Sequence, residues 1–332
     1  MRDGDRIAWV GSSSTRIGIW TRTAEFLLRT RQPRLSLEFQ RCTTGGGTFA
    51  TGLEHLDGWI GEFRPSLVVF NYGGNDAAAG RKGIPKFLDN MNRCVDKARA
   101  AGARVILVTP QAADVRKSGV VSAAQRTLYA EAMLKAGRGR ALPVIDIHWS
   151  SYVLQTYGQR MNPTFSILRD DIHLTDPAYV AWGFFFFDRL GLPPARSEAR
   201  LTAEGRLTAE VSCQVRDVEA SEDGLAFTRC DAILPILPPG PLPPRGCVPL
   251  ESRSRYLLGI DGLPDGDYLI RCEGDPIGVA PAWALAAGVN LNSLLLDSGH
   301  EAPWSGLAAE IWEGRGIDRV GRTAWRFEIR KL

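Results

Sequence analysis

Four short segments of this sequence carry side chains that can do chemistry, and each lies beside a predicted strand or helix. They are residues 11–15 (GSSST), 43–48 (TTGGGT), 73–76 (GGND) and 170–174 (DDIHL). In the first segment, a glycine allows a sharp turn. A serine then begins the next helix, where backbone N–H groups can face a developing oxyanion. In the second segment, three glycines let the backbone approach a ligand closely.

The other two segments supply the remaining parts of a nucleophilic site. Asn75 comes just after a buried strand, where its side-chain amide can donate to an oxyanion. Asp170 and His173 are three residues apart, so one turn can fold the carboxylate onto an imidazole nitrogen and leave the other nitrogen as a base. Taken singly, each segment has a plainer interpretation. The serines can be helix caps, the glycines and GGND can be turns, and the acidic loop can hold an incidental histidine.

Only four histidines are available as a general base, namely His55, His148, His173 and His300. His148 lies two residues after Asp146 at the end of a predicted strand, and this pair is the rival to Asp170 and His173. Neighbours two apart on a strand point the same way but do not fold onto one another. His55 is interpreted as a helix-surface or core histidine, and His300 as part of a polar turn.

Strands and helices alternate through the first 190 residues. The predicted strands are 6–10, 35–40, 67–72, 104–109 and 144–147, and the predicted helices include 19–31, 84–101, 121–136 and 176–190. This alternation predicts an α/β fold with a five-stranded parallel sheet covered by helices on both faces. In such sheets, ligands bind at the carboxyl ends of the strands, which is where the four segments lie.

The sequence changes in character near residue 192, after which alternating stretches predict a smaller β-rich domain. We expect domains at residues 1–195 and 196–332, with a proline-rich loop at 235–246 in the second. The stretches Arg206–Val215, Gly224–Leu234 and Tyr256–Ile260 are predicted strands. The turn signal at 264–266 (PDG) predicts that the last of these forms a hairpin with Tyr268–Cys272.

Composition and charge exclude several other classes of protein. The chain has 332 residues, is 44% hydrophobic and 23% charged, and carries a net charge of +3, which argues against a nucleic-acid-binding polycation. No apolar run is long enough to span a membrane, and no usual zinc spacing or dinucleotide fingerprint occurs. Six cysteines leave both disulfides and buried free thiols open. The N-terminus has no apolar signal core, so we expect a cytoplasmic protein, or an exported one whose leader precedes this sequence.

The four segments, in this order, resemble the blocks of the SGNH (GDSL-type) hydrolase family over about residues 4–192. The resemblance also extends to long planctomycete-type members with an extra C-terminal β-rich part. It implies a three-layer α/β/α, flavodoxin-like domain. It also implies Ser13, His173 and Asp170 as the catalytic triad, and an oxyanion hole formed by Ser13, Gly46 and Asn75. Gly73 and Gly74, in the G-x-N-D block, are the residues expected to bind the substrate.

The resemblance implies a serine esterase that forms an acyl-enzyme without a metal or cofactor. Its substrate would be a small acyl ester, in particular an acetyl ester on carbohydrate, and nucleic acid is not an expected partner. Ser12 departs from the family, which has aspartate there, but serine can still accept a backbone hydrogen bond. This departure keeps a second hypothesis open, a weak or inactive carbohydrate-binding protein. A third is an O-acyltransferase that uses the same triad.

Overall fold

The computed structural model describes residues 1–193, 195–248 and 250–332. The chain forms two compact units, each made of several segments of sequence. The first unit contains Met1–Glu25, Leu35–Leu192 and Gly240–Val248, and the second contains Phe26–Arg34, Pro193–Pro239 and Pro249–Leu332. The predicted loop 235–246 is therefore divided between the units after Pro239. The predicted boundary at 195/196 follows Pro194, which lies outside the described residues.

The first unit is organised around a five-stranded parallel sheet of order β2-β1-β3-β4-β5. This is the flavodoxin-like order, in which the carboxyl ends of β1 and β3 form the switch point. The strands are β1 (Arg6–Gly11), β2 (Glu38–Thr43), β3 (Leu67–Asn71), β4 (Arg104–Val108) and β5 (Val144–Ile145). The predicted α/β class and parallel sheet are thus confirmed.

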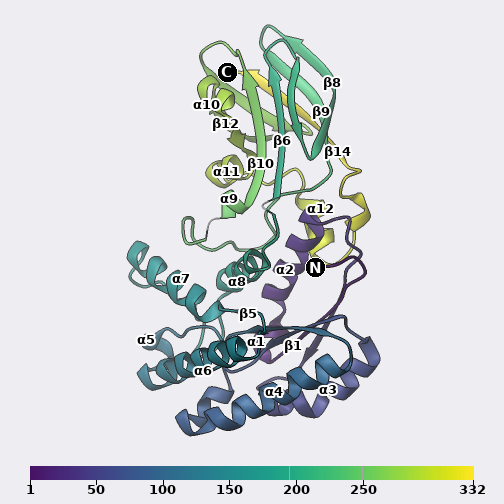
Figure 1. Ribbon diagram of the computed structural model, residues 1–332. Coiled ribbons are helices and arrows are strands. Elements are labelled where there is room, and N and C mark those ends of the chain that lie inside the picture. Colours follow the sequence, from purple (N-terminus) through teal and green to yellow (C-terminus); the bar gives the residue numbers. More distant parts are fainter. Residues whose placement is uncertain (194, 249) are drawn as a thin grey trace. The chain divides into compact units, whose positions relative to one another are not determined.

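Helices cover both faces of this sheet, which gives three layers (Figure 1). Side chains alternate along β1, so that Val10 joins the core beneath α3 and α4, while Trp9 packs on Trp20 of α2 and Phe186 of α8. The helices are α1 (Ser13–Ile17), α2 (Ile19–Arg31), α3 (Phe49–Phe63), α4 (Ile84–Ala100), α5 (Val115–Ser118), α6 (Val120–Gly139), α7 (Ile147–Met161) and α8 (Asp176–Arg189), with short 3₁₀ turns η1 (Asp76–Ala79) and η2 (Arg81–Gly83).

The second unit contains a four-stranded sheet of order β13-β10-β6-β7 and a five-stranded sheet of order β12-β11-β14-β9-β8. The predicted β-rich second part is therefore confirmed. The strands are β6 (Ala195–Thr202), β7 (Leu207–Val211), β8 (Cys213–Ser221), β9 (Gly224–Asp231), β10 (Ser254–Asp261), β11 (Asp267–Cys272), β12 (Asp275–Pro281), β13 (Val289–Asn290) and β14 (Ala324–Lys331). The helices are α9 (Leu250–Arg253), α10 (Ala282–Ala287), α11 (Leu291–Ser298) and α12 (Ser305–Trp312), with the 3₁₀ turn η3 (Ile317–Arg319).

Two predictions for the second unit are wrong. Strands β10 and β11 do not form a hairpin, because β10 pairs with β6 and β13 while β11 pairs with β12 and β14. The hairpin instead joins β11 to β12 through Glu273 and Gly274, whose φ angles of 54° and 86° suit a two-residue turn of the primed type. The stretch Arg206–Val215 is also not one strand. It breaks at Ser212, where φ is 53°, and continues in the other sheet.

A fully buried ion pair on β9 is hydrogen-bonded to the other sheet of the second unit. The guanidinium of Arg229 on β9 donates through Nε to Asp231 Oδ1 at 2.8 Å, and neither side chain is exposed. Arg229 also donates to Ser197 Oγ on β6 and to the carbonyl of Leu257 on β10, each at 2.8 Å. The hydroxyl of Tyr256 donates to Asp231 Oδ2 at 2.6 Å. The two buried charges are thus paired with each other and hydrogen-bonded to groups of the neighbouring sheet.

Replacing Arg229 by methionine should lower the free energy of unfolding by about 3–5 kcal/mol, because Asp231 would remain as an unpaired buried charge. Denaturant unfolding of the purified protein measures this loss. The double variant Arg229→Met/Asp231→Leu is the matched control and should recover most of the stability, since it removes both charges. A single variant as stable as the wild type would contradict the structural role given to this pair.

The sequence left both disulfides and buried free thiols open. In the structure all six cysteines have free thiols. Within the described residues, no helix is long and apolar enough to cross a membrane. The same residues contain no group of three or more His, Cys, Asp or Glu side chains placed to hold a metal ion.

Candidate active site

The serine segment lies at the carboxyl end of β1, where the strand passes directly into α1. Gly11 is required there, because a Cβ at this position would lie 2.3 Å from Thr15 Oγ1 and 2.9 Å from the carbonyl oxygen of Asn71. Thr15 Oγ1 in turn donates to Asn71 Oδ1 at 3.3 Å. Ser13 is the first residue of α1, so its backbone N–H has no partner within the helix.

Ser12 does not brace this loop in the way the sequence predicted. It occupies the N-cap position of α1, but its side chain makes no capping hydrogen bond within the described part of the chain. The turn is held instead by main-chain bonds, from Arg16 N to the carbonyl of Ser12 at 2.9 Å and from Thr44 N to the carbonyl of Gly11 at 3.2 Å. The loop therefore keeps its form without the aspartate that the family usually has.

A continuous hydrogen-bonded chain connects Ser13, His173 and Asp170. The Ser13 hydroxyl lies 3.0 Å from Nε2 of His173, and Nδ1 of the same ring lies 2.9 Å from Asp170 Oδ2. With Nδ1 protonated toward the carboxylate, Nε2 is free to accept the serine proton. Ser14, by contrast, is buried and its hydroxyl accepts a bond from Tyr179 at 3.3 Å. Of the three consecutive serines, Ser13 is the one within reach of His173.

Asp170 is held in its charged form by its hydrogen bonds. Partial burial alone would raise its pKa, but three groups outweigh this effect. They are the backbone N–H groups of His173 and Ile172 and the His173 ring, and together they lower the pKa to about 2. The two backbone bonds to Asp170 Oδ1 measure 2.5 and 2.8 Å. The carboxylate is thus ionised throughout the neutral range and oriented toward the imidazole.

Three side chains that belong to no sequence motif hold the loop that carries Asp170 and His173. Lys117 donates to the carbonyl of Leu168 at 2.6 Å and Ser118 to that of Asp171 at 2.6 Å. Gln111 donates to the carbonyl of Ile172 at 2.9 Å. These donors come from the segment after β4, which carries no motif. Their only signal in the sequence was their place after a strand that ends at the ligand-binding edge.

The GGND segment supplies Gly74 and Asn75 to the surroundings of Ser13. Asn75 Nδ2 donates to the carbonyl of Gly47 at 2.9 Å and keeps one further N–H for a ligand. The Asp76 carboxylate accepts the backbone N–H groups of Phe49 and Gly73 at 3.1 and 3.0 Å, which ties the segment to the start of α3. Burial raises the pKa of Asp76 even though these hydrogen bonds oppose it.

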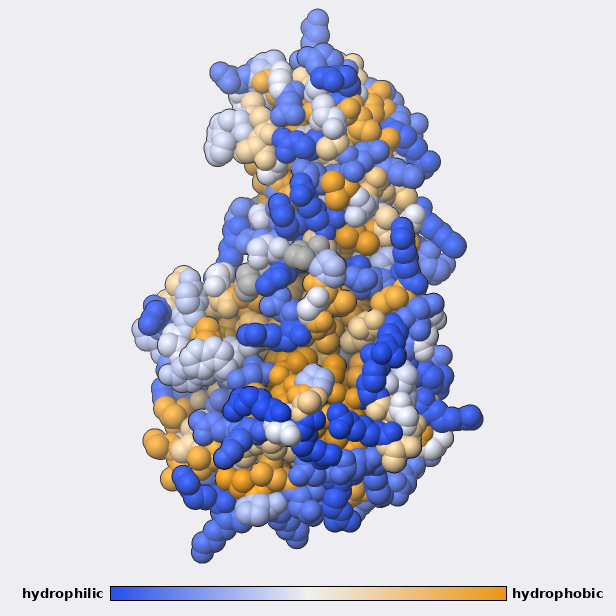
Figure 2. Space-filling view, in the orientation of Figure 1, coloured by the Kyte–Doolittle hydropathy of each residue, from blue (hydrophilic) through white to orange (hydrophobic). Residues whose placement is uncertain are grey.

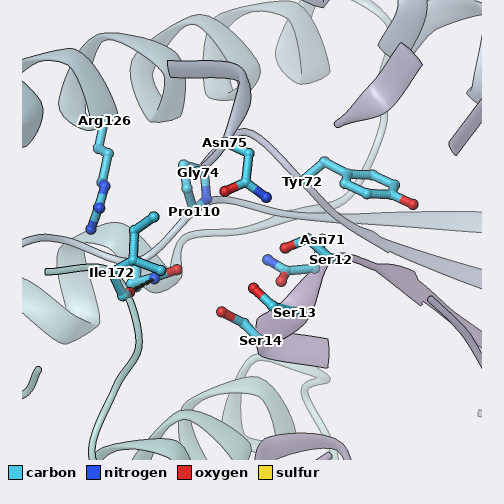
Figure 3. Close-up of a pocket in the computed structure, with 11 residues that line it drawn as sticks. Ser12, Ser13, Ser14, Asn71, Tyr72, Gly74, Asn75, Pro110, Arg126 and Ile172 are labelled. Atoms are coloured by element: carbon cyan, nitrogen blue, oxygen red, sulfur yellow. Dashed lines mark hydrogen bonds between the residues drawn. The ribbon is translucent and has the colours of Figure 1, made fainter. Parts of the chain in front are cut away.

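These segments enclose a small cavity of about 20 Å³, which is room for about one water-sized group. Figure 3 shows Ser13 and Ser14 on one side of it, Asn75 and Gly74 on another, and Ile172 and Arg126 on a third. Its lining residues are Ser12, Ser13, Ser14, Asn71, Tyr72, Gly74, Asn75, Pro110, Gln111, Arg126 and Ile172. The structure thus places Ser13, Asn75 and Gly74, three of the predicted site residues, around one cavity.

Two of the predicted site glycines are not among the residues that line this cavity in the described structure. Gly46 is exposed, has a φ of 67°, and is not one of the residues that line the cavity in the described structure. Gly73 also does not line it. Its φ is 106°, and a Cβ there would meet the Pro110 ring at 3.1 Å, so its role is in the turn. Gly46 as an oxyanion donor stays a prediction.

The other three histidines have different surroundings. His148 is in the first turn of α7, where Nε2 lies 3.1 Å from Thr127 Oγ1, and burial lowers its pKa. Asp146 caps α7 through a bond from Trp149 N at 3.0 Å, so the rival pair does not form a relay. His55 is exposed on α3 and packs near Trp59, as predicted, and His300 is exposed in a loop.

The fold and this site define a serine-hydrolase class of protein, in which a serine, a histidine and a carboxylate lie at the carboxyl edge of a flavodoxin-like sheet. Residues 5–181 match the model of the GDSL-like lipase/acylhydrolase family, which is more than half of the chain. The protein therefore belongs to the GDSL-like lipase/acylhydrolase family, and the predicted assignment to serine ester hydrolases is confirmed at that level. A search of curated proteins gave no significant match.

Solved structures share the fold at low sequence identity. A gut microbial diltiazem-metabolizing enzyme matches with a TM-score of 0.82 at 15% identity, covering 100% of this chain and 98% of that one. An acetylxylan esterase from Geobacillus stearothermophilus matches with a TM-score of 0.50 at 13% identity, covering 59% of this chain and 99% of its own. The acetyl xylan esterase AlAXEase matches with a TM-score of 0.50 at 17% identity, covering 55% of this chain and 98% of its own. The first similarity includes both units, and the other two cover little more than half of this chain.

Proposed function

We propose that this protein hydrolyses esters of small acyl groups, acetyl above all, on carbohydrates. The observation that carries the proposal is the relay from Ser13 through His173 to Asp170, with distances of 3.0 and 2.9 Å. A protein that only bound carbohydrate would not need a serine hydroxyl aligned with a base of fixed orientation. That alignment favours catalysis over the binding-only hypothesis.

The proposed reaction has two halves. His173 Nε2 takes the Ser13 proton as Oγ attacks the ester carbonyl, and the charged imidazole is stabilised by the Asp170 carboxylate. The oxyanion is held by the Ser13 backbone N–H and by the second N–H of Asn75 Nδ2. His173 then protonates the leaving alcohol. In the second half, it activates a water that releases the acyl group from Ser13.

The size of the cavity supports a short acyl group. The volume of about 20 Å³ leaves room for a methyl-sized group beside Ser13, and a longer chain would have to extend out of the cavity. Rates on p-nitrophenyl acetate, butyrate and octanoate test this directly, and we expect an acetyl optimum with a steep fall beyond butyrate. A long-chain optimum would refute the small-acyl proposal. Adding a sugar acceptor and looking for its acylated product separates hydrolysis from acyl transfer.

An exposed aromatic surface on α7 supports carbohydrate as the alcohol part. Helix α7 begins directly after β5, at the edge of the sheet where Ser13 lies. Trp149 and Tyr152 are 57% and 51% exposed, and their rings are stacked with centroids 5.7 Å apart. Figure 2 shows pale and orange surface gathered at the position of α7, at the left edge of the view. Two of the similar structures are named as acetylxylan esterases, which agrees with this choice.

Replacing Trp149 by alanine should raise KM for an acetylated xylo-oligosaccharide about fivefold to tenfold more than KM for p-nitrophenyl acetate. The reason is that stacking of a sugar on an exposed indole contributes about 1 kcal/mol. Steady-state kinetics on both esters measure the difference. Trp283, 75% exposed on α10 of the second unit, gives the matched control as Trp283→Ala. An equal change in KM for both esters would show that Trp149 does not contact the sugar.

A further inference from the structure

Arg126 is a buried cation in the wall of the active-site cavity that the proposed reaction does not use. It lies on α6, its side chain is only 3% exposed, and it lines the same cavity as Ser13 and Asn75. Figure 3 shows its guanidinium extending from the helix toward the side of the cavity that Ile172 forms. A buried guanidinium is costly unless its charge and its N–H groups are paired.

The pairing of Arg126 is incomplete within the described residues. Nη2 donates to the carbonyl of Asp171 at 3.1 Å, whereas Nη1 is buried without a hydrogen-bond partner. The nearby negative charges are those of Asp171 and Asp170, which act at longer range than an ion pair. Asp170 already accepts three hydrogen bonds from Ile172 and His173, so it is occupied by the relay. Arg126 thus has an unused donor in the wall of the cavity that Ser13 also lines.

We propose that Arg126 recognises a carboxylate carried by the substrate, so that this esterase prefers esters of negatively charged molecules. The Arg126 guanidinium lacks a hydrogen-bond acceptor for Nη1 and a countercharge, and a carboxylate supplies both. A sugar hydroxyl supplies only the first. The inference rests on the proposed function, since it places the carboxylate on an ester that Ser13 attacks. It specifies that the substrate carries a negative charge, either on its alcohol part or on its acyl part.

Paired esters that differ only in charge test this inference. On the alcohol side, the pair is 3-acetoxybenzoate and its methyl ester, and on the acyl side it is monoethyl succinate and ethyl butyrate. We expect the wild type to prefer the charged member in one pair. Arg126→Gln should reduce that preference in kcat/KM about tenfold to a hundredfold, mainly through KM, because one charge-assisted hydrogen bond is lost. Arg126→Lys should retain part of the preference, since it keeps the charge.

Arg138→Gln is the matched control, because it removes an exposed arginine from the same helix and should leave the preference unchanged. A wild type without charge preference in either pair overturns the inference while the neutral esters still report the proposed function. Equal losses on charged and neutral esters in Arg126→Gln also overturn it, because that is the effect of releasing the Asp171 carbonyl alone. Hydrolysis of none of the esters would refute the proposed function instead.

A binding measurement makes the test independent of turnover. In the Ser13→Ala background, calorimetric titration with 3-acetoxybenzoate and with monoethyl succinate should show binding of at least one of them. That binding should weaken about tenfold or more when Arg126→Gln is added. Unchanged affinity on adding Arg126→Gln, or no binding of either ester, would overturn the role of Arg126.

Discussion

Replacing Ser13 by alanine should lower kcat on p-nitrophenyl acetate by about 10⁴-fold to 10⁶-fold, the scale of loss when the nucleophile of such a relay is removed. The hydroxyl of Ser13 lies 3.0 Å from His173 Nε2, and an alanine offers no atom for the acyl group to bond to. The remaining rate would come from the oxyanion donors and from ester binding alone. Initial rates of p-nitrophenol release measure this effect.

Ser14→Ala is the matched control for this prediction. It removes the same atom from the adjacent residue, but the Ser14 hydroxyl is occupied by Tyr179 and we expect a far smaller loss of rate. Mass spectrometry of the acid-quenched wild type should find the acyl group on the peptide that contains Ser13. If Ser13→Ala kept full activity, or if the label were found on another residue, the nucleophile would be misassigned.

Replacing Asp170 by asparagine should lower kcat by about 10⁴-fold with little change in KM, because an amide facing Nδ1 favours the wrong imidazole tautomer. An asparagine oxygen can still accept from the backbone N–H groups of Ile172 and His173, so the loop should keep its shape. Asp171→Asn is the matched control, since it removes the neighbouring exposed charge and leaves the relay intact. A loss for Asp171→Asn as large as that for Asp170→Asn would point to a general charge effect.

The pKa of Asp170 adds a pH test to this prediction. Because this pKa is lowered to about 2, the carboxylate stays charged as pH falls from neutral. Its negative charge is lost only as pH approaches about 2. An acid limb in kcat/KM between pH 4 and 7 must therefore arise from a group other than Asp170. If Asp170 carried that limb, Asp170→Asn would abolish the pH dependence in this range. We expect instead a much lower rate that still declines toward acid pH.

The order of strands and helices in the first unit was predictable because the apolar periodicity there is strong. Strand β3 is apolar along its length except for its last residue, Asn71, which suits a central parallel strand, and the structure places it between β1 and β4. Strand β2 was predicted about three residues early, at 35–40, because its register is set by pairing with β1, where Arg6 lies opposite Glu38. Helix α7 was not predicted, since several of its large apolar side chains, such as Trp149, Val153 and Met161, are exposed and blur the apolar face that Ile147 and Leu154 form.

The second unit was less predictable because partners there come from distant parts of the chain. The turn at 264–266 suggested a local hairpin, yet β10 takes β6 as a parallel partner and β11 takes β14, both far away in sequence. Local turn chemistry cannot decide between two sheets when each strand edge has more than one possible partner. The Arg229–Asp231 pair lies within β9, but its complete burial results from the packing of the two sheets and does not follow from the spacing of the two residues.

The sequence by itself determined which residues of the active site are chemically able to act. GSSST and GGND each place one reactive type at the end of a predicted strand, DDIH places two before a helix, and that order indicates the family. The tertiary structure decided which serine meets the histidine, since Ser13 and His173 are 160 residues apart and only the parallel sheet brings their loops to one edge. It alone revealed Arg126, because burial with an unused donor is a property of packing and not of residue type or spacing.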